Sequence, residues 1–259
     1  MAPWSEDDLL STRRRTFLGA PMHDLDMAET LALAETAMRE RRPMLHTVVN
    51  VAKLVNMGKN PELFEDVAGA DIINVDGAGV LLGTRLLGVP VKERVAGVDL
   101  MAALLALCAA RGYRPYLLGA EQQVLDAMVA ELRRRHPRLE LAGMQNGYFA
   151  AEDEDDIVAA INRSKADCLF VALPTPRKER FLKRHRAGLT PSFVMGVGGS
   201  FDVYGGKVRR APLLVQKLGL EWLFRVAQEP RRLWRRYFDT NRAYAVLLWR
   251  AFWRRRALH

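Results

Sequence analysis

The chain has 259 residues, of which 49% are hydrophobic and 27% are charged, and its formal net charge is +9. This composition is ordinary for a soluble globular protein with one large domain, with or without an appendage. The first ten residues include Glu6, Asp7 and Asp8 and do not read as a secretory signal, and no uncharged apolar run is long enough to span a bilayer. We therefore expect a cytoplasmic protein, unless its surface attaches it elsewhere.

The positive charge is concentrated in the C-terminal part. Residues 203–259 contain fourteen Lys or Arg and three Asp or Glu, a balance of +11, whereas residues 1–202 contain 25 basic and 27 acidic side chains. Four of the five tryptophans lie in the same part, namely Trp222, Trp234, Trp249 and Trp253. This division predicts an α/β core over residues 1–202 and a basic, aromatic-rich appendage over residues 203–259.

Short apolar runs alternate with amphipathic segments along the core. The amphipathic segments predict helices at Met27–Arg41, Asp99–Ala110, Glu121–Arg135, Glu152–Ser164 and Pro176–Arg186. The apolar runs predict strands at Met44–Val51, Asp71–Val75, Arg114–Leu118, Leu139–Met144, Cys168–Leu173 and Ser192–Gly196. We expect Asp99 to be the N-cap of its helix and Gly112 to lie just past the end. The alternation favours an α/β fold with a largely parallel, Rossmann-like sheet covered by helices on both faces.

The segment NVDGAGV, residues 74–80, begins at the end of the second predicted strand, after the apolar run of residues 70–73. Its glycines approach the dinucleotide-binding fingerprint but leave one residue too many before the last glycine, Gly83. The acidic residue that this motif needs about 20 positions later is Asp99, which opens a helix instead. A carboxylate at a strand end that is followed by glycines has room beside it for a substrate. Asp76 is therefore a candidate catalytic residue, and the alternative is an ordinary Asp-Gly turn.

Several other candidates lie at the ends of predicted strands or just after them. They are Asn50, Gly119, Gly198 and Gly199. Because ligands bind beyond the carboxyl ends of parallel strands, we expect these residues to converge with Asp76 on one edge of the sheet. The unobstructed glycine amides suit phosphate binding, although each could be a plain tight turn. Arg94 could reach an anionic group at the same edge or form a surface salt bridge.

Signals for metal binding and redox chemistry are weak. The aspartates of residues 24–26 and 153–155 match a two-aspartate metal pattern, but neither pair follows a core strand, and chance is the better explanation. The histidines show no ligand spacing. Cys108 and Cys168 lack paired spacing, so we expect buried, reduced thiols.

Arginines and aromatic residues recur at near-helical spacing in the appendage, in RRAP (209–212), LEWLFR (220–225) and EPRRLWRRYF (229–238). This pattern suits a polyanion at an apolar boundary, and nucleic acid is one candidate. A membrane surface with anionic lipid or a lipid pyrophosphate is another. It is favoured by AYAVLLWRAFW (243–253), which suits the interface but is too short and too charged to span a bilayer. A helix packed on its own domain, with solvated arginines, is the third interpretation.

Taken in order, these segments resemble the bacterial glycosyltransferases of the WecG/TagA/CpsF family over roughly residues 44–237. The most specific parts are VDGAGV followed by ERVAGVDL, and then GVGGSFDVYGGKVRRAP running into GLEWLFRVAQEPRRLWRRY. The resemblance implies inverting transfer of a hexose or N-acetylhexosamine-type sugar from a UDP-sugar to a polyprenyl-pyrophosphate-linked saccharide. The products would be cell-wall polymers or exopolysaccharides.

The family's functional residues map onto this chain one by one. The resemblance makes Asp76 the general base and places Asn50 and Arg94 at the substrate. The arginines implied to face the membrane and the pyrophosphate are Arg210, Arg225, Arg232, Arg235 and Arg236.

Two departures concern the polar residues of the sugar pocket. The family usually has Thr two residues before its Asn, whereas this chain has Val48 there and Thr47 one place earlier. The family also reads Gly-x-Pro-x-Gln-Glu after a later strand, and here PTPRKE places Pro174 and Lys178 at the Gly and Gln positions. We include Thr47 and Lys178 among the candidate substrate-binding residues, and the identity of the donor sugar stays open.

We therefore predict an inverting glycosyltransferase that is cytoplasmic and peripheral on the inner face of the cell membrane. It should need no cofactor or metal, because glycine amides, helix N-termini and arginines can stabilise the departing diphosphate. The enzyme should have no nucleic-acid partner, and a homo-oligomer is left open. The alternative is a non-catalytic, basic nucleic-acid-binding α/β protein, and a dinucleotide-dependent oxidoreductase is a weaker third.

Overall fold

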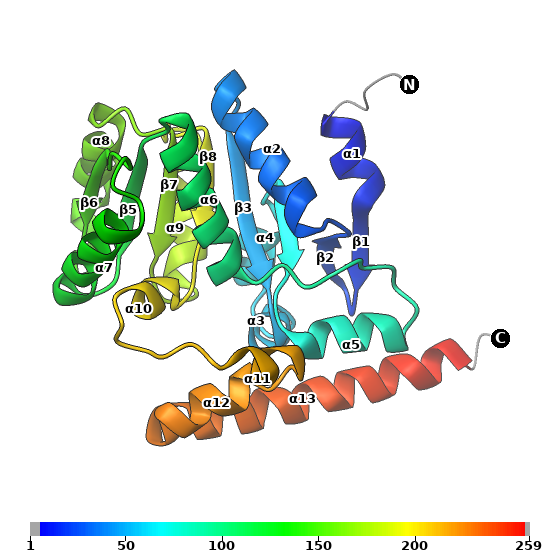
Figure 1. Cartoon of the computed structure of the whole chain (residues 1–259). Coiled ribbons are helices and arrows are strands. Elements are labelled where there is room, and N and C mark those ends of the chain that lie inside the picture. Colours follow the sequence, from blue (N-terminus) through cyan, green and yellow to red (C-terminus); the bar gives the residue numbers. More distant parts are fainter. Residues whose placement is uncertain (1–5, 257–259) are drawn as a thin grey trace.

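Six parallel strands form the central sheet in the computed structural model, which describes residues 6–256 (Figure 1). Their order across the sheet is β4-β3-β8-β7-β5-β6. The strands are β3 (Met44–Val49), β4 (Ile72–Val75), β5 (Pro115–Gly119), β6 (Gly143–Gln145), β7 (Cys168–Ala172) and β8 (Phe193–Gly196). A separate antiparallel hairpin is formed by β1 (Arg14–Phe17) and β2 (Ala20–His23). The predicted α/β fold with a parallel, Rossmann-like sheet is confirmed.

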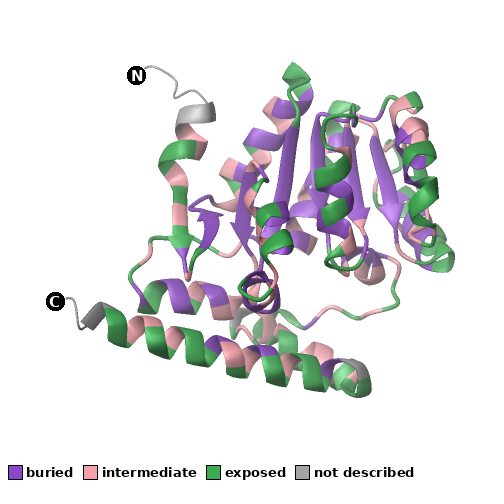
Figure 2. Ribbon diagram, turned by 180° about the vertical axis from the view of Figure 1, so that it is seen from behind, coloured by how far each residue is buried: buried purple, intermediate pink, exposed green. Residues whose placement is uncertain are grey.

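Helices cover both faces of the sheet, as predicted. They are α1 (Glu6–Arg13), α2 (Met27–Glu40), α3 (Val51–Met57), α4 (Pro61–Ala68), α5 (Ala78–Leu86), α6 (Gly97–Arg111), α7 (Gln122–Arg135), η1 (Ala151–Asp153), α8 (Glu154–Arg163), α9 (Arg177–His185), α10 (Ser200–Tyr204), α11 (Leu213–Lys217), α12 (Glu221–Gln228) and α13 (Pro230–Arg256). One apolar cluster joins the sheet to α3, α4, α8 and α9, and a second joins it to α2, α6, α7 and α10. Because both faces are covered, the central strands are buried along their length (Figure 2).

The start of α6 differs from the prediction. This helix begins at Gly97, its N-cap residue is Ala96, and Asp99 lies inside its first turn. The prediction of Asp99 as N-cap is therefore wrong. The predicted end is confirmed, because Gly112 caps α6 in the left-handed conformation, with φ of 76°.

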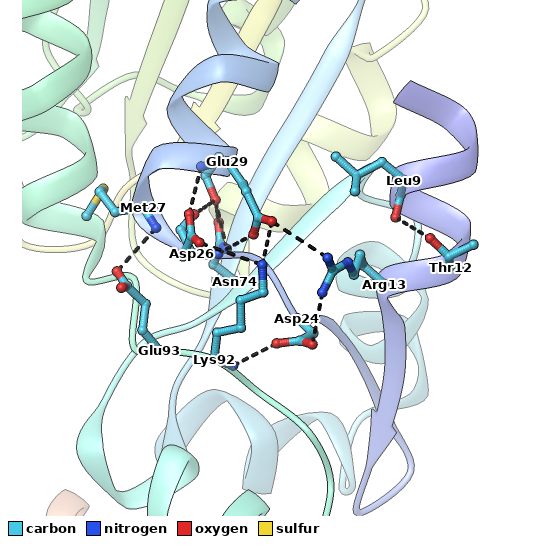
Figure 3. A network of polar contacts seen from close by, with 11 residues as sticks. Leu9, Thr12, Arg13, Asp24, Asp26, Met27, Glu29, Asn74, Lys92 and Glu93 are labelled. Carbon is cyan, nitrogen blue, oxygen red and sulfur yellow. Dashed lines mark hydrogen bonds and ion pairs between the residues drawn. The ribbon is translucent and has the colours of Figure 1, made fainter. Parts of the chain in front are cut away.

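The two-aspartate segment 24–26 has local structural roles (Figure 3). Asp26 forms a capping box with Glu29 at the start of α2, accepting a hydrogen bond from the Glu29 amide at 2.8 Å. Asp24 accepts from the Lys92 amide at 2.7 Å and pairs with Arg13. Within residues 6–256, no three His, Cys, Asp or Glu side chains are grouped as a metal site would require.

The two cysteines are buried, as predicted, but they are not isolated from each other. The Sγ atoms of Cys108 in α6 and Cys168 in β7 are 3.7 Å apart. Hydrogen bonding with Cys108 and burial raise the pKa of the Cys168 thiol.

The segment after α10 lies across the edge of the sheet where the parallel strands end (Figure 1). Its long helix α13 packs against α3, and against α5 through Tyr244 and Leu248; these two residues and Phe252 join the first apolar cluster. None of the helices in residues 6–256 combines the length and the apolar character needed to cross a membrane. The division into two regions at residue 202 stays a prediction.

Candidate active site

Asp76 stands at the point where β4 ends and the chain turns into α5. Its amide donates to the Val49 carbonyl of β3 at 2.9 Å, which extends the strand pairing by one residue. The next residue, Gly77, has φ of 108°, a conformation that strains any residue with a Cβ. The Asp-Gly pair is thus a strand-to-helix turn that presents a carboxylate beyond the sheet edge.

The Asp76 carboxylate is set among opposing charges. Desolvation by burial raises the pKa of Asp76, and this effect outweighs the lowering by the Arg94 charge, by a hydrogen bond from the Gly97 amide and by the Arg225 charge. The Gly97 amide is the first of α6, so the carboxylate caps a helix that has no side-chain cap of its own. A carboxyl group with a raised pKa in a partly enclosed site is suited to general-base catalysis.

Helix α12 brings two further charges over Asp76. Glu221 accepts a 2.5 Å hydrogen bond from the Arg94 guanidinium, and both side chains are mostly buried. Arg225, one turn further along α12, places its Nη2 only 3.0 Å from where a Cβ on Gly199 would stand. Residues four apart share one face of a helix, so α12 presents Glu221 and Arg225 together to the core. The structure thereby brings together Asp76, Arg94, Gly199 and Arg225, which the sequence had selected separately.

A second ion pair links the segment before α11 to the core. Both terminal nitrogens of Arg210 approach the Asp99 carboxylate, at 2.5 and 2.6 Å, in a bidentate arrangement. The predicted role of Arg210 toward a lipid pyrophosphate stays a prediction, and its partner in this structure is Asp99.

Thr47 and Lys178 belong to a buried polar cluster on the other face of the sheet. Lys53 of α3 donates to the Thr47 hydroxyl at 3.1 Å and pairs with Glu179 at 2.9 Å. Lys178 approaches Glu179 at 3.4 Å and donates to the Val197 carbonyl at 3.2 Å. Burial and the Lys53 charge lower the pKa of Lys178 to about 8. Burial by itself would raise the pKa of Glu179, but the Lys53 and Lys178 ammonium groups lower it to about 2.

Thr47 does not take the place of the threonine expected two residues before Asn50. Side chains alternate along a strand, so Thr47 and Val48 face opposite sides of the sheet. Val48 Cγ1 lies 3.9 Å from where a Cβ on Gly97 would stand, on the side of Asp76. The hydroxyl of Thr47 instead faces Lys53.

The remaining candidates in the core are Asn50, Gly119 and Gly198, and each has different surroundings in the structure. Asn50 caps α3 by accepting from the Lys53 amide at 2.9 Å. A Cβ on Gly119 would lie 2.4 Å from the Ala172 carbonyl oxygen, so close strand packing already requires glycine there. A Cβ on Gly198 would meet nothing within 4 Å, and this residue borders open space. Substrate binding by these residues stays a prediction.

The later appendage arginines lie on α13. Arg235 and Arg236 are exposed, and the side chain of Arg232 is outside the described part of the structure. Their predicted role at the membrane and the pyrophosphate stays a prediction.

Sequence reasoning missed several residues that hold the site together. Gly97, Glu221, Lys53 and Glu179 were not selected, although each contacts a selected residue. The four-residue spacing of Glu221 and Arg225 could have indicated a shared helix face. No sequence signal pairs Lys53 with Glu179, because 126 residues separate them.

Comparison with known proteins adds an independent observation. Residues 15–258 match the model of the glycosyl transferase WecG/TagA/CpsF family. Two N-acetylglucosaminyldiphosphoundecaprenol N-acetyl-beta-D-mannosaminyltransferases are similar to the chain. The one from Bacillus spizizenii is 35% identical over 190 residues, which is 73% of each chain. The one from Bacillus subtilis is 33% identical over 178 residues, 69% of this chain and 68% of its own.

Proposed function

Because the chain belongs to the WecG/TagA/CpsF family of glycosyl transferases, we propose that it moves an N-acetylhexosamine-type sugar from a UDP-sugar to a polyprenyl-pyrophosphate-linked saccharide. The names of the two relatives favour N-acetylmannosamine as the sugar and N-acetylglucosaminyl-diphosphoundecaprenol as the acceptor. The product would enter cell-wall polymer or exopolysaccharide synthesis.

The observation that carries this proposal is the position of Asp76 between α5, α6 and α12. In the proposed reaction, Asp76 accepts the proton of the acceptor hydroxyl while the hydroxyl oxygen bonds to the anomeric carbon. The bond from that carbon to the UDP oxygen breaks, and its electron pair leaves with the diphosphate. A single displacement from the face opposite the leaving group inverts the anomeric centre.

The leaving diphosphate needs positive partners as its charge grows. Arg225 and the Gly199 backbone lie together beside Asp76, and guanidinium and amide donors can stabilise such charge in place of a divalent cation. We therefore propose that transfer proceeds without a metal.

We also propose that the enzyme is peripheral on the inner face of the cell membrane. One side of α13 carries exposed apolar residues, namely Trp234, Phe238, Val246, Trp249 and Trp253. Exposed Arg235 and Arg242 lie on the same side. A helix of this kind is suited to lie at the boundary of an anionic membrane.

The test is a transfer assay with purified protein and a short-chain lipid-pyrophosphoryl-N-acetylglucosamine. UDP-N-acetylmannosamine and a panel of other UDP-sugars are supplied, each with and without EDTA. We expect a disaccharide product with a β linkage by NMR, at a rate that EDTA leaves nearly intact. Absence of product with every donor would refute the proposed reaction, and an EDTA-abolished rate restored by Mg²⁺ or Mn²⁺ would refute metal independence.

A further inference from the structure

A cavity of about 290 Å³ opens between α5 and α11, next to the candidate active site. Its lining residues are Ala78, Leu81, Arg94, Leu213 and Gln216. The two helices approach closely there, because a Cβ on Gly219, just after α11, would stand 2.5 Å from the Ala78 side chain. The cavity thus lies between a core helix and the appendage, at the edge of the sheet where Asp76 lies.

The walls of this cavity differ sharply in polarity. Arg94 supplies a guanidinium group, whereas Ala78, Leu81 and Leu213 supply apolar surface. Further exposed leucines continue along the same two helices, namely Leu82 and Leu86 of α5, Leu214 within α11 and Leu218 just after it. A single arginine in a cavity with apolar walls is complementary to a ligand with an anionic head and a hydrocarbon tail.

Arg94 already holds an anion in this structure, the Glu221 carboxylate at 2.5 Å. Arg94 also acts on Asp76, and its charge lowers the pKa of that carboxyl. An anionic group bound at Arg94 would therefore lie near the proposed base. It would also have to compete with Glu221 for the guanidinium.

Building on the proposed function, we propose that this cavity receives the diphosphate and the first isoprenoid units of the lipid-linked acceptor. Arg94 binds the diphosphate, and Glu221 occupies the place of that diphosphate until it arrives. Leu81 and Leu213 contact the isoprenoid chain, which continues past the exposed leucines toward the membrane.

The polarity of the cavity favours the lipid diphosphate over the nucleotide diphosphate. A uridine nucleotide carries a base and a ribose that need several hydrogen-bonding partners, yet Arg94 and Gln216 are the only polar side chains among the five lining residues described. An isoprenoid chain needs none and gains from contact with leucine surface.

The experiment measures binding by calorimetry in the full-length protein, without donor sugar or turnover, so that it stands apart from the transferase assay. The probes are farnesyl diphosphate, inorganic pyrophosphate and UDP. Glu221→Gln removes the competing charge and should tighten binding of farnesyl diphosphate and pyrophosphate by roughly 2- to 5-fold, the strength of a part-exposed ion pair. Arg94→Gln should weaken both by about 10-fold or more.

The hydrocarbon part is tested with Leu213→Asn, at a side chain that is 74% exposed and can change without loss of the core. We expect farnesyl diphosphate to bind roughly 5- to 10-fold more weakly, with pyrophosphate unchanged. Two matched controls should alter neither ligand: Leu247→Asn, at an exposed leucine of α13, and Glu62→Gln, whose carboxylate pairs with Arg180 far from the cavity.

Three results would overturn the proposal. Weaker diphosphate binding in Glu221→Gln would make Glu221 a support for Arg94 instead of a competitor. Equal changes in the affinity for farnesyl diphosphate in Leu213→Asn and Leu247→Asn would show that the isoprenoid chain does not bind in the cavity. If Arg94→Gln weakened the binding of UDP alone, Arg94 would belong to the donor site. Loss of transferase activity with these binding results intact would instead count against the proposed reaction.

Discussion

The Tyr244 hydroxyl, on α13, donates a hydrogen bond of 2.8 Å to the backbone carbonyl of Gly79, in the helix that follows Asp76. The same hydroxyl would stand 2.1 Å from a Cβ on Gly83, so the ring fits only because α5 carries glycine there. The last helix is therefore fastened directly to the helix that positions the proposed base.

This contact predicts a graded loss of stability at Tyr244. Tyr244→Phe removes one buried hydrogen bond and should lower the free energy of unfolding by about 1 kcal/mol. Tyr244→Ala also removes the buried ring and should cost about 3–5 kcal/mol. Urea unfolding of both variants measures the effect, with Tyr148→Phe, at a side chain that is 74% exposed, as the control. Equal stability of Tyr244→Ala and wild type would show that α13 does not fold onto α5.

Asp76→Asn keeps the shape of the side chain but removes its basic oxygen. We expect turnover to fall by roughly 10²–10⁴-fold, the usual loss when general-base catalysis is removed. Because the pKa of Asp76 is raised, wild-type kcat should fall as the pH is lowered through a value above the ordinary 3.8. The pH–rate profile measures both effects, and the acid limb should vanish in the variant. Near wild-type turnover would remove Asp76 from the role of base.

The raised pKa of Asp76 also predicts how Asp76→Asn changes the stability of the protein. Burial disfavours the ionised carboxylate, so the native state loses stability as the pH rises from the unfolded pKa through the raised native pKa. Above that pKa the whole penalty is present, and asparagine removes it. Asp76→Asn should therefore be at least as stable as wild type at pH 8, which separates a catalytic loss from misfolding.

Much of this arrangement could be predicted from the sequence, and the exceptions have identifiable physical causes. The strand ending before Asp76 is an apolar run, which local pattern identifies. The start of α6 was misplaced because its first amide is capped by Asp76, from a distant segment, and not by the local Asp99. Helix α5 was missed because Gly79 and Gly83 weaken a helical pattern. Both glycines are required by long-range packing, against Val51 and Tyr244 respectively.

The buried cluster was missed for a similar reason. Lys53 and Glu179 are ordinary charged residues in amphipathic segments, and only the fold brings α3 and α9 together beside Thr47. The site at the sheet edge could thus be assigned from strand ends and glycines, whereas the charges that support it depend on tertiary contacts.

Glu179→Gln is predicted to be strongly destabilising. The substitution leaves Lys53 and Lys178 buried without a counter-charge, which should cost about 3–5 kcal/mol at pH 7. Because the native pKa of Glu179 is about 2, against 4.5 unperturbed, the stability from this carboxylate is complete above the unfolded pKa. It is lost as the pH falls toward 2, so the difference between variant and wild type should shrink over that window.

Two further variants serve as controls for Glu179, both followed by urea unfolding. Glu65→Gln breaks a surface pair with Lys183 and should change stability little. Lys178→Gln keeps the Lys53–Glu179 pair and removes an ammonium whose pKa burial lowers to about 8, so it should be neutral or stabilising at pH 7. A large loss in Lys178→Gln would mean that both ammonium groups are needed to hold Glu179.

The apolar side of α13 is predicted to bind anionic membranes. Arg235 and Arg242 lie among its exposed aromatic residues, and each arginine at such a surface contributes about 1 kcal/mol. Reversing both charges, in Arg235→Glu with Arg242→Glu, should weaken binding to vesicles rich in anionic lipid by about 30-fold or more. Co-sedimentation measures the binding. Arg133→Glu with Arg138→Glu is the matched control, because these exposed arginines lie in the last turn of α7 and in the loop from α7 to β6, away from α13.

The aromatic residues should act independently of lipid charge. Trp249 and Trp253 are 65% and 51% exposed, so replacing both with serine should leave the packing of α13 on α5 intact. Their loss removes apolar area that would enter the interface, and vesicle binding should fall for neutral and anionic lipid alike. The charge-reversal pair should instead bind more weakly to anionic vesicles alone. At high salt, which screens the wild-type charges, the difference in vesicle binding between this pair and wild type should disappear. If both pairs of variants sediment like wild type, α13 is not the membrane anchor and its arginines are ordinary solvated charges.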